Sequence, residues 1–132
     1  MDHAIVLETT FLVDLDRERS QEREDRCRRL LREHKDHRLF ITDTIAGELA
    51  SGLTLSGRET WESFIAPFRI LAHIPDINWK YGVLFRHLSE NGLMIGANDL
   101  WIAATCLAYD IPVVTRNTAH FKRIPELRVI GY

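Results

Sequence analysis

The sequence has few of the features that mark a secreted, membrane-bound or zinc-binding protein. Its two cysteines, Cys27 and Cys106, stand far apart and show no metal-ligand spacing, which favours reduced thiols inside the cell. No apolar run approaches the ~20 residues that a membrane span needs. The N-terminal stretch lacks the basic segment of a signal peptide. We therefore expect a cytoplasmic protein that does not associate with a membrane.

An excess of positive charge is also absent. The chain carries 17 lysines and arginines against 19 aspartates and glutamates, a formal net charge of −2. Proteins that bind nucleic acid through many phosphates are usually basic, so broad phosphate contact is disfavoured. A function on nucleic acid would then depend on a local patch or on a bound metal ion. The length of 132 residues, without repeats or linkers, predicts a single domain over 1–132.

Short apolar runs alternate with helical patterns along the chain. We expect strands at 4–7, 38–42, 68–74 and 112–115, and an edge strand at 127–132. The spacing of apolar residues predicts helices at 21–35, 43–54, 77–91 and 98–110. In 77–91, one side of the helix would carry Trp79, Val83, Leu84 and Leu88. The alternation is typical of an α/β fold, and we predict a three-layer α/β/α domain with a mainly parallel four- or five-stranded sheet.

Four oxygen-bearing side chains fall near the predicted carboxyl ends of strands. Glu8 directly follows the first strand, and Glu48 borders the apolar face of the helix after the second. Asp99 lies in the first turn of helix 98–110, and Asn117 follows the fourth strand by two residues. Taken singly, each has an ordinary explanation as an exposed acid, a helix-end acid or a turn residue. Ligands gather at this edge of a parallel sheet, however, so we expect all four in one crevice.

Carboxylates that cluster in a crevice repel one another. Two of them at ~4 Å destabilise each other by ~4 kcal/mol at an effective dielectric constant near 20. Such a cluster either shares protons or binds a cation. Because these residues offer oxygen donors and no Cys/His set accompanies them, hard ions such as Mg²⁺ or Mn²⁺ are favoured over zinc. A hard ion could join an acidic site to a phosphate and activate water.

Four motifs in the chain resemble those of one family. They are "VLETTFLVDL" with Glu8, "GELASG" with Glu48, "NDLWIAATCLA" with Asp99, and "VVTRNTAHF" with Asn117. In this order and spacing they are similar to the motifs of PIN-domain ribonucleases, especially the VapC-type toxins of toxin–antitoxin pairs. The resemblance spans nearly the whole chain, and its C-terminal pair of motifs is the more specific part.

The resemblance implies a Mg²⁺- or Mn²⁺-dependent endoribonuclease. By analogy with the family, Glu8, Glu48 and Asp99 would bind the metal and act in catalysis, Asn117 would be the fourth catalytic position, and Thr115 would support the site through its hydroxyl. The implied partners are an RNA substrate, a cognate antitoxin protein and a second copy of the chain in a homodimer.

Basic residues occur in two places. Arg116 and His120, with Lys122 and Arg123 after them, follow the fourth strand, and we expect Arg116 and His120 to contact RNA phosphate. The mixed charges of 17–38 favour a solvated helix face with i, i+4 pairs. A docking surface for an antitoxin or an RNA-contacting face is the functional alternative for that segment.

Two residues depart from the family pattern and leave other functions open. Glu8 stands where Asp is the commonest residue, and Thr10 stands where Asn or Ser is usual. The extra methylene moves a carboxylate by ~1.5 Å, and Mg²⁺ tolerates little distortion of its ligands. The alternative function is therefore a catalytically weakened PIN-like module that binds RNA or protein. A flavodoxin-like phospho-signalling domain is disfavoured, because no paired acids follow the first strand.

Overall fold

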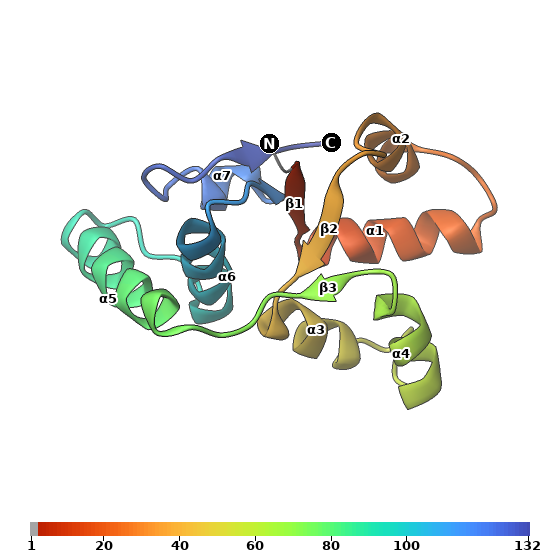
Figure 1. Cartoon of the computed structure of the whole chain (residues 1–132), viewed down its shortest axis with the longest axis horizontal. Coiled ribbons are helices and arrows are strands. Elements are labelled where there is room, and N and C mark those ends of the chain that lie inside the picture. The colour runs from red at the N-terminus through yellow and green to blue at the C-terminus, as the bar shows by residue number, and fades with distance from the viewer. Residues whose placement is uncertain (1–2) are drawn as a thin grey trace.

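The computed structural model describes residues 3–132 and contains a sheet of five short strands with helices on both faces (Figure 1). The strands are β1 (Ala4–Leu7), β2 (Arg38–Ile41), β3 (Arg69–Ile70), β4 (Val113–Val114) and β5 (Val129–Ile130). The helices are α1 (Thr9–Ser20), α2 (Arg26–Glu33), α3 (Asp43–Ala50), α4 (Arg58–Ile65), α5 (Pro75–Glu90), α6 (Ala97–Tyr109) and α7 (Thr118–Phe121). The predicted α/β class is confirmed.

The sheet is entirely parallel, with the strand order β3-β2-β1-β4-β5. β1 lies at its centre, where Val6 is paired with Phe40 of β2 and Val113 of β4. Figure 1 shows α1 and α2 on one side of the strands and α5 and α6 on the other. Because all strands run the same way, the segments that follow β1 and β4 leave the sheet at the same edge.

The central strand and the helices beside it supply most of the core. Ile5, Val6 and Leu7 are fully buried, as is typical of a strand that is covered on both faces. The small side chains Ala103 and Ala104 of α6 are fully buried in this core. Among residues 3–132, no helix combines the length and the apolar character needed to cross a bilayer.

Three helices were not predicted, and several bounds differ from the predicted ones. α1, α4 and α7 occupy segments to which the sequence pattern assigned no element. The helix expected over 21–35 begins only at Arg26, and the strand expected over 68–74 is limited to Arg69–Ile70. The predicted buried side of α5 is also wrong in part. Trp79 is 64% exposed and Val83 is 39% exposed, whereas Ile77, Leu84 and Leu88 pack in the core.

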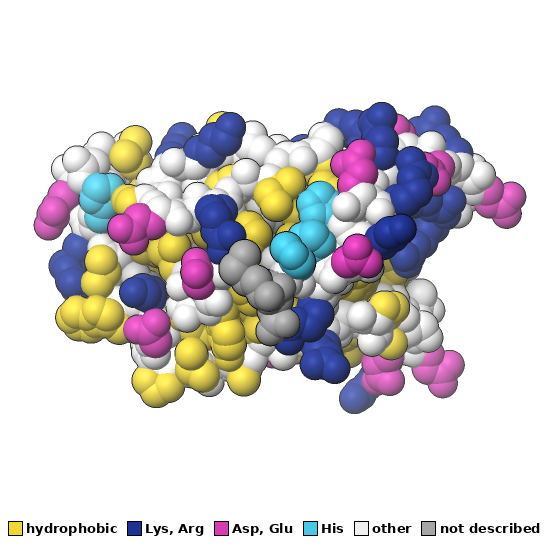
Figure 2. Space-filling view, turned by 45° about the horizontal axis from the view of Figure 1, so that its top comes forward, with side chains coloured by type: hydrophobic (Ala, Val, Ile, Leu, Met, Phe, Trp, Pro, Cys, Tyr) yellow, Lys and Arg dark blue, Asp and Glu magenta, His cyan; other side chains and the backbone are white. Residues whose placement is uncertain are grey.

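Three histidines meet where β1 begins and α2 leads into β2. The ring of His37 lies 4.9 Å from that of His3 and 4.7 Å from that of His34, measured between centroids. The Nδ1 of His37 is buried and has no hydrogen-bond partner among the described residues. Figure 2 shows histidine side chains together on this face, beside the Lys and Arg side chains that gather toward α2.

We expect the protein to lose stability in mild acid because of this cluster. Burial lowers the pKa of His37, the neighbouring His34 and His3 lower it further, and Asp36 opposes them. A histidine whose pKa is depressed by folding stabilises the native state fully above its unfolded pKa of about 6.5, and that contribution is lost as the pH falls. The urea midpoint should therefore drop between about pH 7.5 and about pH 5.5. A His37→Gln variant should show a shallower drop than a His87→Gln control on α5, and equal slopes would contradict the expectation.

Candidate active site

Glu8 is the buried carboxylate at the carboxyl end of the central strand. It is 2% exposed and caps α1, where its Oε2 accepts a hydrogen bond from the Thr10 backbone N–H at 3.1 Å. Its Oε1 accepts from two hydroxyls, Thr10 Oγ1 at 2.7 Å and Thr115 Oγ1 at 2.5 Å. Glu8 is therefore not an exposed loop acid, which was the ordinary explanation for this residue taken singly.

The two threonines join Glu8 to the segment that follows β4. The Thr10 hydroxyl accepts the backbone N–H of Arg116 at 3.0 Å, and the Thr115 hydroxyl accepts that of Asn117 at 3.0 Å. Each hydroxyl thus donates to the carboxylate and accepts from the backbone, which a single threonine can do. Asn117 is half-buried and stands at the N-cap position of the short helix α7, where its side chain makes no capping hydrogen bond. Thr115 therefore contacts Glu8 directly, and its role as a site-supporting residue stays a prediction.

Glu48 lies between α1 and α6. Its Oε1 accepts a hydrogen bond of 2.6 Å from Thr9 Oγ1, one residue after Glu8. Its Oε2 accepts a longer one of 3.4 Å from the amide of Asn98, one residue before Asp99. Glu48 is thus held by the immediate chain neighbours of the other two acids.

Asp99 lies in the first turn of α6, beside the other two acids. Burial is the largest cause of its raised pKa, and the negative charges of Glu8 and Glu48 raise it further. His120 acts in the opposite direction, with its Nδ1 3.7 Å from Asp99 Oδ2. A carboxylate that is destabilised by two other carboxylates indicates a site that would be stabilised by a cation.

The three carboxylates share one electrostatic environment without converging as ligands. Within residues 3–132, no three His, Cys, Asp or Glu side chains are arranged so that they could hold one metal ion. The oxygens of Glu8 and Glu48 are instead occupied by the hydrogen bonds to threonine and asparagine described above. That these acids form one set of metal ligands stays a prediction.

Arg116 has a partner that the sequence did not indicate. Its Nη1 lies 2.9 Å and 3.2 Å from the two carboxylate oxygens of Asp14, a buried acid on α1. The hydroxyl of Tyr132 donates to the same carboxylate at 2.6 Å. Half of the Arg116 side chain remains exposed, so a contact with phosphate stays a prediction, as it does for His120. No periodic signal in the sequence links Asp14 to residues more than 100 positions away.

Comparison with known proteins places the chain in a family. The family model of the PIN domain matches residues 5–127, from β1 past α7, and so includes all four candidate residues. The chain belongs to the PIN-domain family. This confirms the resemblance that the sequence motifs predicted.

Several curated relatives that match the chain are named Ribonuclease VapC, and several structures that match it are of VapBC proteins. Ribonuclease VapC2 of Rickettsia felis is 32% identical over 98 residues, which are 70% of this chain and 73% of that protein. Ribonuclease VapC1 of Haemophilus influenzae is 28% identical over 130 residues, 93% of each chain. The structure of VapBC2 from Rickettsia felis, bound to a promoter DNA fragment, superimposes with a TM-score of 0.82 at 27% identity and covers 98% of both chains. DNA-bound VapBC from Salmonella typhimurium shares the fold, with a TM-score of 0.81 at 20% identity over 99% of this chain and 98% of that one.

Proposed function

We propose that the protein is a metal-dependent endoribonuclease, the toxin of a VapBC-type toxin–antitoxin pair. The observation that carries the proposal is that Glu48 is hydrogen-bonded to the chain neighbours of Glu8 and Asp99, and that the charges of Glu8 and Glu48 raise the pKa of Asp99, in a PIN-domain chain. Relatives named Ribonuclease VapC and structures of VapBC complexes support the same function. An RNA substrate, a cognate antitoxin, a homodimer and a cytoplasmic location belong to this proposal.

The donor chemistry of the site fits a hard divalent cation, Mg²⁺ or Mn²⁺. Glu8, Glu48 and Asp99 would hold the ion, with Asn117 at the fourth position, since all of them offer oxygen donors. When bound, such an ion supplies an activated water and neutralises charge on the phosphate oxygens. Thr10 and Thr115 position Glu8, while Thr9 and Asn98 position Glu48. His120 lies beside Asp99, where it can donate a proton or a hydrogen bond to phosphate.

Cleavage assays with purified protein and mixed cellular RNA test this function. We expect cleavage in Mg²⁺ or Mn²⁺ and none in EDTA. Glu48→Gln should lower the rate by about 100-fold or more, because it removes a charge from the proposed metal site. Glu59→Gln, an exposed acid on α4, is the matched control and should cut at the wild-type rate. Metal-independent cleavage, or a fully active Glu48→Gln variant, would contradict the proposal.

A catalytically weakened binding module is the second candidate, and one observation favours it. Glu8 accepts three hydrogen bonds within the protein and is 2% exposed, so its oxygens are less available as ligands. Under this alternative the protein would bind RNA or a protein partner in EDTA and in Mg²⁺ alike, without cleavage. The same assays, read together with RNA binding, distinguish the two candidates.

A further inference from the structure

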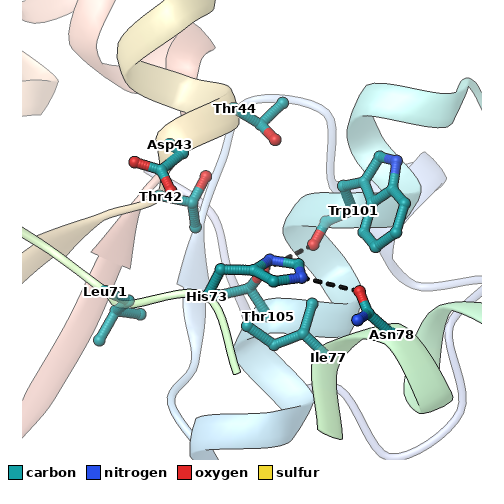
Figure 3. Close-up of a pocket in the computed structure, with 9 residues that line it drawn as sticks. All are labelled: Thr42, Asp43, Thr44, Leu71, His73, Ile77, Asn78, Trp101 and Thr105. Carbon is teal, nitrogen blue, oxygen red and sulfur yellow. Dashed lines mark hydrogen bonds between the residues drawn. The ribbon is translucent and has the colours of Figure 1, made fainter. Parts of the chain in front are cut away.

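A cavity of about 390 Å³ lies between α3, the segment after β3, α5 and α6 (Figure 3). Trp101 borders it on the α6 side, and Thr44 faces it from α3. Figure 3 shows the ring of His73 next to the amide of Asn78, and a hydrogen bond of 2.7 Å runs from His73 Nε2 to Asn78 Oδ1. Ile77 contributes an apolar surface. The proposed metal-site acids do not line this cavity.

The cavity nevertheless adjoins the acids, because the same two helices form both. Thr44 and Glu48 are one turn apart on α3, so they share a face of that helix. Asn98, Trp101 and Thr105 likewise share a face of α6. The hydrogen bond from Asn98 to Glu48 brings these two faces together next to Asp99. Thr44, which lines the cavity, therefore lies about one helical turn, ~5.4 Å along the axis of α3, from Glu48.

The lining of the cavity suits a planar heteroaromatic ring. Tyr81 stacks on one face of Trp101, with ring centroids 3.9 Å apart and an angle of 21° between the planes, and the ring of His73 lies 6.0 Å from that of Trp101 at an angle of 60°, so neighbouring rings hold the indole in place. The amide of Asn78 and the hydroxyl of Thr44 can donate and accept hydrogen bonds at the edge of such a ring. No lysine or arginine is among the described residues that line the cavity, and Asp43 adds a negative charge. These groups disfavour a phosphate and favour an uncharged base.

We propose that this cavity binds one nucleobase of the RNA strand, next to the phosphate that is cleaved. The inference rests on the proposed function, since the strand would pass the acids before it reaches the cavity. Trp101 would supply the stacking surface, and Asn78, held by His73, would contact the edge of the base. The cavity would then determine which base is accepted at one position beside the cut.

Two readouts test the cavity. First, random-sequence 12-mer RNA is cleaved in Mg²⁺ or Mn²⁺ and the products are sequenced. Wild-type protein should show a base preference at one position beside the cut. Trp101→Ala and Asn78→Ala should reduce that preference about 10-fold, within the range expected for loss of base stacking. Trp101→Phe should retain most of it, which also separates stacking from a folding defect. Trp79→Ala, a 64% exposed tryptophan outside the cavity, should behave as wild type.

Second, binding of fluorescein-labelled A12, C12, G12 and U12 RNA is measured in EDTA by anisotropy, which does not require cleavage. Wild-type protein should discriminate among the four, and Trp101→Ala and Asn78→Ala should lose affinity and discrimination together. Base discrimination that depends on these residues, without cleavage by the wild type, would support the cavity and refute the nuclease. Cleavage and binding that are unchanged in both alanine variants would overturn the cavity proposal alone. The cavity proposal would also be overturned if the two alanine variants lost dimerisation or antitoxin binding while their RNA binding stayed intact. The cavity would then be a protein-contact surface. Wild-type protein that neither binds nor cuts RNA would overturn both proposals.

Discussion

Replacing Asp99 with Asn should abolish RNA cleavage and at the same time stabilise the protein in EDTA. Loss of a residue that supports a metal ligand typically lowers activity by about 10- to 100-fold. Asp99 is itself a proposed ligand, so cleavage should fall by more than this. Stability should rise because burial, Glu8 and Glu48 all raise the Asp99 pKa. A carboxylate whose pKa is raised by folding weakens the native state at any pH where it is ionised. The thermal midpoint in EDTA at neutral pH should therefore be higher in the variant.

Asp76→Asn is the matched control for this experiment. Asp76 also lies in the first turn of a helix, α5, but it is exposed and is not among the charged groups that shift the pKa of Asp99. An acid at a helix N-terminus normally stabilises by ~0.3–1 kcal/mol, so Asp76→Asn should lower the midpoint slightly. The two variants are thus expected to shift stability in opposite directions. Addition of Mn²⁺ should raise the midpoint of the wild type and of Asp76→Asn more than that of Asp99→Asn. An Asp99→Asn protein that cuts normally, or is destabilised in EDTA, would contradict the assignment.

The positions of the candidate acids could be predicted from sequence because each depends on local structure. Glu8 directly follows a largely buried strand, and Asp99 lies in the first turn of a helix whose alanines Ala103 and Ala104 are buried. Once the strands are parallel, chain order alone places these residues at one edge. The hydrogen bonds of the acids could not be predicted. Thr115 reaches Glu8 across 107 positions of sequence, and no periodicity encodes such a contact.

α1 was missed because its buried face carries acids. Phe11, Leu12 and Leu15 are buried there, but so are Asp14 and Glu18. Two acids on the inner face obscure the apolar pattern by which an amphipathic helix is recognised. Their burial is explained by partners elsewhere. Asp14 is bound by Arg116 and Tyr132, which lie 102 and 118 positions away. The helix predicted over 21–35 is longer than α2, because the charged residues of the turn at 21–25 continue the pattern of charged residues on α2.

Glu18 is the residue that connects the end of α1 to the start of α2. It is 6% exposed, and its carboxylate accepts three backbone N–H groups, from Asp25 at 3.1 Å, Cys27 at 2.8 Å and Arg28 at 3.2 Å. Asp25, at the N-cap of α2, makes no side-chain capping bond, so Glu18 satisfies these donors in its place. A buried carboxylate with three amide donors contributes more to stability than an exposed helix cap.

Glu18→Ala should therefore destabilise the protein by about 2–4 kcal/mol, because it leaves three N–H groups without their acceptor. Glu33→Ala, an exposed acid on α2, should change stability by less than about 0.5 kcal/mol.

The pH dependence of the Glu18 contribution gives a second test. Burial by itself raises the Glu18 pKa, but the N–H donors outweigh it and hold the pKa below its usual value. A carboxylate of this kind stabilises fully above its unfolded pKa of about 4.5 and loses that contribution as the pH falls through its folded pKa. Urea denaturation should thus show a difference between wild type and Glu18→Ala that is constant near neutrality and shrinks below about pH 4. A difference that persists unchanged in acid would mean that the loss comes from packing of the side chain and not from its charge. Glu8 is the N-cap residue of α1, which also carries Asp14, so loosening of the junction between α1 and α2 should also weaken the acid cluster. Cleavage by Glu18→Ala should therefore decline at temperatures where Glu33→Ala remains active.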